Sequence, residues 1–290
     1  MDRPDSTQDL GQVKNSPGLS QLYPIDSIGR TMNLNVTILM YHAISNEHGE
    51  SPGADAHYSV SKQKFESNLR RIATAGMQCD SVANILVRGQ ISKNSVALTF
   101  DDGHASNLFA SEMIAKAGGR ADFFVNPSSV GTPHYLEWSA LRDMAASGMS
   151  IQSHGFHHRY LDELSPADVR KELIDSKRAI EDQLGLPVTV FAPPGGRVAT
   201  NLEKAAADAG YRAVCSSRVG LWRFGEEFWD IPRLAVLAST SDAQFGRWVR
   251  QAPFEILGRR ARYVLLRGAK RLLGNQGYER LRQGLLRTPG

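Results

Sequence analysis

The sequence of 290 residues predicts a barrel-like α/β fold with about seven parallel strands. Short apolar runs rich in β-branched and aromatic residues recur along the chain, and amphipathic stretches separate them. Strands and helices that alternate in this way usually form a parallel sheet covered by helices. An open, doubly wound sheet is the alternative, because periodicity alone does not distinguish it from a barrel.

The predicted strands lie within residues 35–240, which we interpret as one domain. Their ranges are Val36–Tyr41, Val96–Phe100, Ala121–Val125, Met149–Ser153, Val188–Ala192, Ala213–Ser216 and Ala235–Leu237. The clearest helix starts after Ser165, a good N-cap, with Pro166 at its first position. Gly185 is suited to close that helix.

The two ends of the chain differ from this domain. Residues 1–34 are polar and contain many Gly, Pro and Ser, which predicts an extended arm. Residues 241–290 hold eleven basic and three acidic side chains, although the whole chain has a net charge of only +4. Their apolar residues recur at helical spacing, which predicts a basic amphipathic tail in peripheral contact with an anionic membrane. A helix docked on the barrel is the alternative, and no nucleic-acid motif accompanies the charge.

The cellular location is predicted from the disulfide, membrane-span and secretion-signal patterns that the sequence does not contain. Two cysteines exclude a disulfide framework, and no run of about 18 apolar residues predicts a membrane span. The N-terminus has no basic-then-apolar pattern of a secretion signal. We therefore expect a cytoplasmic protein, peripheral to the inner membrane if the tail binds lipid.

Two adjacent carboxylates, Asp101 and Asp102, follow the strand predicted at 96–100, in the segment TFDDG. The carboxyl ends of parallel strands usually carry the active site. Adjacent residues of an extended chain point in different directions, so one carboxylate can bind a metal while the other faces a nucleophile. Taken alone, the segment is equally consistent with a solvated turn.

Three of the eight histidines lie in SHGFHH, residues 153–158, directly after another predicted strand. His154 and His158 are four residues apart, a spacing that can bring two imidazoles to one ion, and His157 should point away. Two histidines and one carboxylate leave coordination positions open for water and substrate. Non-haem iron uses the same ligands, so they do not identify the metal.

A third segment, FAPPGGR at residues 191–197, ends a predicted strand in a Pro/Gly turn. The amides of Gly195 and Gly196 can approach a substrate oxygen closely. By itself, an ordinary connecting turn explains these residues better.

Together the three segments resemble the NodB-type polysaccharide deacetylases, carbohydrate esterase family 4, over roughly residues 36–237. The resemblance implies a distorted (β/α) barrel that removes N-acetyl groups from a glycan or glycolipid. It implies Asp101 as the catalytic base and the Gly195 amide as an oxyanion donor. It also implies a divalent metal, foremost Zn²⁺, bound by Asp102, His154 and His158.

The sequence departs from the family pattern in its third motif. That motif usually begins with an arginine that orients the base, and it has an aromatic residue before its last glycine. Ala192 and Gly195 occupy these two positions. Arg197 and Arg233 are the candidates to orient Asp101, and the sequence does not rank them.

The family's late acid histidine is missing too, because no histidine follows His158. Poly-N-acetylglucosamine deacetylases look like circularly permuted members of the family, with the acid histidine near the start of the sequence. In this chain His42, at the end of the run ILMYH, resembles that histidine. We predict His42 as the general acid, with a pKa raised by a nearby carboxylate. A strand-end histidine without chemistry is the alternative. Two other functions stay open: hydrolysis of a non-sugar C–N bond, and a non-catalytic carbohydrate-binding or scaffold role.

Overall fold

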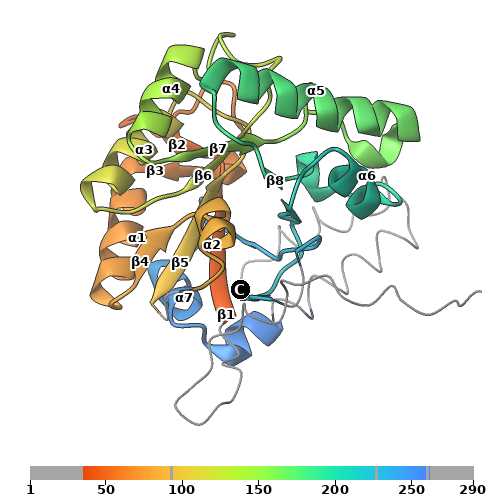
Figure 1. Ribbon diagram of the computed structural model, residues 1–290. Coiled ribbons are helices and arrows are strands. Elements are labelled where there is room, and N and C mark those ends of the chain that lie inside the picture. The colour runs from red at the N-terminus through yellow and green to blue at the C-terminus, as the bar shows by residue number, and fades with distance from the viewer. Residues whose placement is uncertain (1–34, 92–93, 226–227, 259–260, 262–290) are drawn as a thin grey trace, which may run out of the picture. The chain divides into compact units, whose positions relative to one another are not determined.

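The computed structural model describes residues 35–91, 94–225, 228–258 and 261. A curled sheet forms its centre (Figure 1). Seven of its nine strands follow one path in the order β10-β1-β5-β6-β7-β8-β9. The pairs along this path are parallel except β1 with β10, and β4 and β11 add parallel partners to β5 and β1. The strands are β1 Asn35–Tyr41, β4 Gln78–Asp80, β5 Ser95–Phe100, β6 Asp122–Val125, β7 Ser150–Ser153, β8 Val190–Phe191, β9 Ala213–Val214, β10 Trp222–Arg223 and β11 Leu234–Ala235.

Helices cover the outer face of this sheet (Figure 1). Their apolar sides pack against outward strand residues such as Leu39, Leu98 and Phe123 in one large buried cluster. The helices are α1 Lys62–Thr74, α3 Asn107–Lys116, α4 Trp138–Ala146, α5 Pro166–Leu184, α6 Leu202–Asp208 and α7 Asp242–Val249. Smaller elements complete the chain: β2 Ala43–Ser45, β3 Ser59–Ser61, η1 Ala56–Tyr58, η2 Leu161–Glu163 and η3 Pro194–Gly196.

The inner face of the sheet has an apolar core of its own. Side chains alternate along a strand, so β1, β5 and β6 also contribute Ile38, Ala97 and Phe124 to a second buried cluster. Helix α2, Val82–Arg88, supplies further members of this cluster, among them Ile85. The sheet curls around this core as a half-barrel, which agrees with the predicted distorted barrel and not with a doubly wound sheet.

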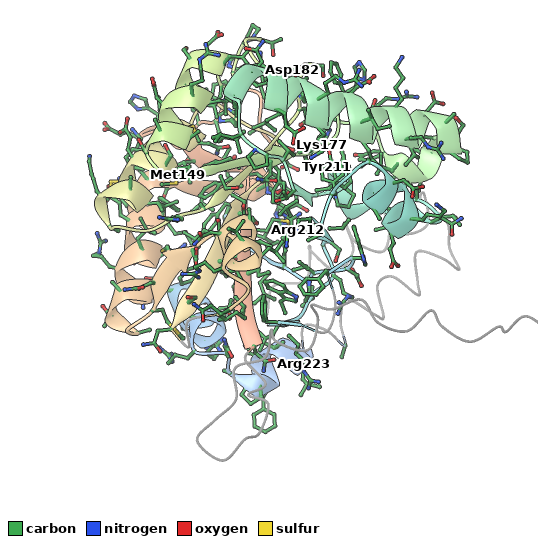
Figure 2. All side chains as sticks on the ribbon, in the orientation of Figure 1. Met149, Lys177, Asp182, Tyr211, Arg212 and Arg223 are labelled. Carbon is green, nitrogen blue, oxygen red and sulfur yellow. The ribbon has the colours of Figure 1, made fainter. Side chains whose placement is uncertain are left out.

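Helix α5 has the predicted ends and is fixed to the sheet. The Ser165 side chain accepts a hydrogen bond from the Asp168 amide, and Gly185 closes the helix at φ 65°. The Tyr211 hydroxyl donates to the Leu173 carbonyl at 2.9 Å, and the Lys177 ammonium lies 5.5 Å from the Tyr211 ring centroid (Figure 2). This anchoring matters because α5 also holds the loop with the paired histidines.

All seven predicted strands are present, and α7, which follows them in the chain, packs on the outer helices. It contacts α1, and its Phe245 and Trp248 are fully buried in the outer core. The rest of the predicted tail, residues 259–260 and 262–290, and the predicted arm 1–34 lie outside the described residues. Within the part of the chain that is described, no helix has the length and apolarity to cross a membrane.

Candidate active site and metal centre

Asp101 and Asp102 follow β5 directly, and their carboxylates lie in different surroundings. Asp101 continues the inward register of Ala97 and is only 3% exposed. Asp102 has the left-handed φ of 74°, which turns the chain immediately after Asp101. Gly103 follows at φ 71°, where an added Cβ would lie 3.0 Å from the Val125 side chain. The glycine of TFDDG is therefore required for this close approach to β6.

Arg233 holds Asp101 in place from a distant part of the chain. Its two guanidinium nitrogens donate to the two carboxylate oxygens at 2.6 and 2.8 Å, and both side chains are buried. Its Nε donates to the Ser216 carbonyl at 3.0 Å. Burial alone would raise the pKa of Asp101, but Arg233, followed by His154, brings that pKa below its ordinary value. Of the two candidate arginines, Arg233 is the one that orients this carboxylate.

His154 and His158, in the loop after β7, lie next to Asp102. The Nε2 atoms of His154 and His158 lie 3.3 and 3.2 Å from the same Asp102 oxygen, Oδ1. One ligand atom from each of these three residues falls within 4.8 Å of the others. Nδ1 of His154 hydrogen-bonds the Ala192 carbonyl at 2.7 Å, which fixes the ring with Nε2 toward the cluster. This donor set fits a divalent cation.

The surroundings of Asp102 keep its carboxylate ionised. Burial would raise the pKa of Asp102, yet hydrogen bonds with His154 and His158 hold that pKa well below its usual range. The carboxylate is thus ionised over the pH range in which histidine is neutral and can bind metal. His158 has φ 56°, a second left-handed residue among the three. Such backbone strain is typical of functional sites.

A buried glutamate shapes the loop that carries the histidines. Glu172 of α5 accepts hydrogen bonds from the amides of Phe156 and His157 at 2.8 and 2.9 Å. Its other oxygen lies 2.7 Å from Nδ1 of His157, so that ring faces α5 and not the cluster, as expected. On the other side, the Asn126 amide donates to the His154 carbonyl at 2.6 Å.

His42 follows β1 on the same rim of the sheet. Its ring packs on Tyr58 with 4.5 Å between centroids, and its Nδ1 is buried with no hydrogen-bond partner among the described residues. Asp101 and Asp102 are close enough to raise its pKa, but burial has the larger effect, so the pKa is lowered. The prediction of a raised pKa was wrong because it ignored desolvation.

Gly195 lies in the turn after β8, with φ 61°. The preceding Ala192 carbonyl is the partner of His154, so this turn and the histidine cluster are linked directly. The other arginine candidate, Arg197, does not reach Asp101. It pairs with Glu163 at 2.5 Å instead.

Comparisons with known proteins agree with this architecture. Residues 88–214 match the family described as polysaccharide deacetylase. The Bacillus subtilis protein YxkH is 29% identical over 217 residues, 73% of this chain and 75% of YxkH. The peptidoglycan-N-acetylglucosamine deacetylase of Bacillus cereus is 28% identical over 121 residues, 41% of this chain and 54% of that protein.

A solved structure extends the likeness to about three quarters of the chain. The Streptococcus pyogenes deacetylase PplD, solved in complex with acetate, matches with a TM-score of 0.67 and 25% identity. The match covers 76% of this chain and 98% of PplD. Residues 88–214 therefore match a polysaccharide deacetylase domain, and the fold is the NodB-type barrel of the structural neighbours.

Proposed function

We propose that this chain hydrolyses N-acetyl groups of a glycan or glycolipid with a divalent metal, foremost Zn²⁺, at Asp102, His154 and His158. The observation that carries the proposal is the convergence of these three ligand atoms beside a buried carboxylate paired with an arginine. When bound, the cation supplies Lewis acidity, which polarises the acetyl carbonyl and acidifies a water.

Asp101 is the proposed general base. Its pKa lies below the ordinary value, so the carboxylate is ionised at neutral pH and can accept a proton from the attacking water. The bidentate contact with Arg233 fixes the orientation of both oxygens. Arg233 thereby takes the place of the arginine that is missing at Ala192.

The leaving sugar nitrogen needs a proton, and His42 is the proposed donor. Support comes from its place on the rim with Asp101 and Asp102 and from its buried Nδ1 without a partner. The Gly195 amide is the proposed donor to the carbonyl oxygen as that oxygen gains negative charge.

The direct test is acetate release from a panel of substrates: N-acetylglucosamine oligomers, peptidoglycan, an N-acetylated glycolipid and non-sugar acetamides. We expect release from at least one sugar substrate, loss of release with EDTA, and recovery on adding Zn²⁺. Release only from non-sugar amides would assign the same site to other C–N bonds. Glycan binding without any release would indicate a non-catalytic protein and refute the proposal.

His42→Ala tests the acid, and His48→Ala, in an exposed loop, is its matched control. The His42 variant should keep its metal and lose about 10²-fold or more in turnover. Because the pKa of His42 is lowered, the protonated acid becomes scarce as pH rises, and wild-type activity should fall with it. A His42→Ala protein with the same turnover and the same alkaline decline would exclude this role.

A further inference from the structure

Tyr160 is an exposed aromatic residue beside the proposed active site. It lies two residues after His158 and keeps 39% of its surface exposed. Its ring packs against the backbone of Gly195, where an added Cβ would lie 2.7 Å from the Tyr160 Cε1 atom. A ring from the histidine loop therefore occupies the space in which a side chain at position 195 would lie.

The ring is also supported on one of its faces. The guanidinium carbon of Arg197 lies 3.9 Å from the Tyr160 ring centroid, a stacked cation–π contact. Arg197 is held in turn by Glu163 at 2.5 Å and Asp162 at 3.7 Å. The three charged residues thus fix the ring without burying it.

The Tyr160 ring is a preorganised contact surface for a ligand. Its orientation is set before any ligand binds, so little side-chain entropy is lost on binding. An aromatic face is apolar and matches the C–H face of a sugar ring, and aromatic side chains commonly line ligand sites. Val198, the residue after Arg197, is a further apolar side chain with 49% of its surface exposed.

We propose that Tyr160, supported by Arg197, is a stacking surface for a neutral sugar unit next to the one that loses its acetyl group. This inference rests on the proposed function and names a residue that selects the substrate. The charge of Arg197 is already balanced by Glu163 and Asp162, so this guanidinium is not free to pair with a carboxylate of a ligand. A neutral N-acetylhexosamine unit is therefore favoured here over a sugar that carries a carboxylate.

Steady-state kinetics on N-acetylglucosamine oligomers of increasing length tests the proposal. Tyr160→Ala should raise KM for a hexamer about ten-fold, leave kcat within about three-fold, and leave the monomer unaffected. Tyr160→Phe should behave as wild type, because the ring is retained. Phe254→Ala, which removes an aromatic residue that is 90% exposed, is the control.

A binding measurement separates this inference from the proposed function. Calorimetric titration of EDTA-treated protein with the hexamer requires no turnover, and Tyr160→Ala should weaken binding by about the same factor. If wild type releases no acetate yet shows this difference, only the proposed function fails. Equal hexamer affinities in wild type and Tyr160→Ala, or no hexamer binding at all, would overturn the stacking surface.

Two further measurements complete the test. Unchanged Tm values for Tyr160→Ala and Tyr160→Phe would show that the kinetic effects are not losses of fold. An oligomer with carboxylate-bearing sugars should bind wild type more weakly than the neutral hexamer. Equal affinity for both would refute the preference for a neutral unit.

Discussion

Two buried aspartates inside the curled sheet have opposite pKa shifts. Asp101 lies at the rim and Asp122 lies beside α2, and neither is more than 3% exposed. Burial raises both pKa values, but Arg233 reverses the effect at Asp101. Asp122 accepts hydrogen bonds from the Val82 and Ala83 amides at the start of α2, and burial still raises its pKa to about 7. A buried carboxylate stays ionised where a cation is paired with it.

The two ends of the interior of the curled sheet also differ in the polarity of their buried side chains. Toward the start of β1 and β5 the inward residues are apolar, as Ile38 and Ala97 are, and α2 packs against them. Four residues further along, the same inward faces carry His42 and Asp101. One end is therefore apolar and the other carries the proposed catalytic residues, and each end can be perturbed separately.

The largest expected effect is at the histidine cluster. His154→Ala removes one of three ligands, so bound metal and acetate release should both be lost. His157→Ala is the matched control, because its ring faces Glu172 and both properties should survive. Elemental analysis and an acetate assay of the two variants measure this. Equal metal content in His154→Ala and wild type would contradict the assignment of the site.

Substitution of Asp101 should lower both the turnover and the free energy of unfolding. Asp101→Asn should lower turnover by about 10²- to 10⁴-fold, the usual range for a general base. It should also cost about 3–5 kcal/mol of unfolding free energy, because Arg233 stays buried without its partner.

The double variant Asp101→Asn/Arg233→Met separates these two effects. With both charges removed, the unfolding free energy should recover while turnover does not. Denaturant unfolding and acetate release on the same preparations measure this. Turnover that recovered with stability would mean that Asp101 acts only through the fold.

The smallest effects on turnover are expected at the end of the interior that packs against α2. Asp122 has a higher pKa folded, about 7, than unfolded, about 3.9. Its contribution to stability is therefore complete below about pH 4 and is lost as pH rises through about 7, by up to about 1.4 kcal/mol per pH unit. Asp122→Asn should remove this slope in EDTA-treated protein. An unchanged slope would show that Asp122 does not titrate in this range.

Ile85→Ala is the control for that measurement. Ile85 is fully buried in α2, so its truncation should cost about 2–5 kcal/mol at every pH without altering the slope. Turnover should change little, because the residue belongs to the apolar end. A large loss of kcat with intact folding would break the proposed separation of the two ends.

The strand pattern of the barrel could be read from the sequence because it depends on local periodicity. Runs such as Val96–Phe100 are apolar throughout, since one set of side chains meets the helices and the other the interior. Short elements were missed: β2, β3, β4 and β10 have two or three residues each, too few for a periodic signal. The packing of α7 on α1 is a long-range contact, which local periodicity does not report.

For the site, the segments TFDDG, SHGFHH and the Pro/Gly turn could be predicted from the sequence, because each follows a predicted strand directly. The distant residues that contact them could be identified only in the folded chain. Arg233 is 132 positions from Asp101, and nothing local distinguishes it from Arg197. Glu172 looks like a surface residue of an amphipathic helix, and the lowered pKa of His42 depends on burial. Pairing across the fold and desolvation arise only when the chain is folded, so no local pattern encodes them.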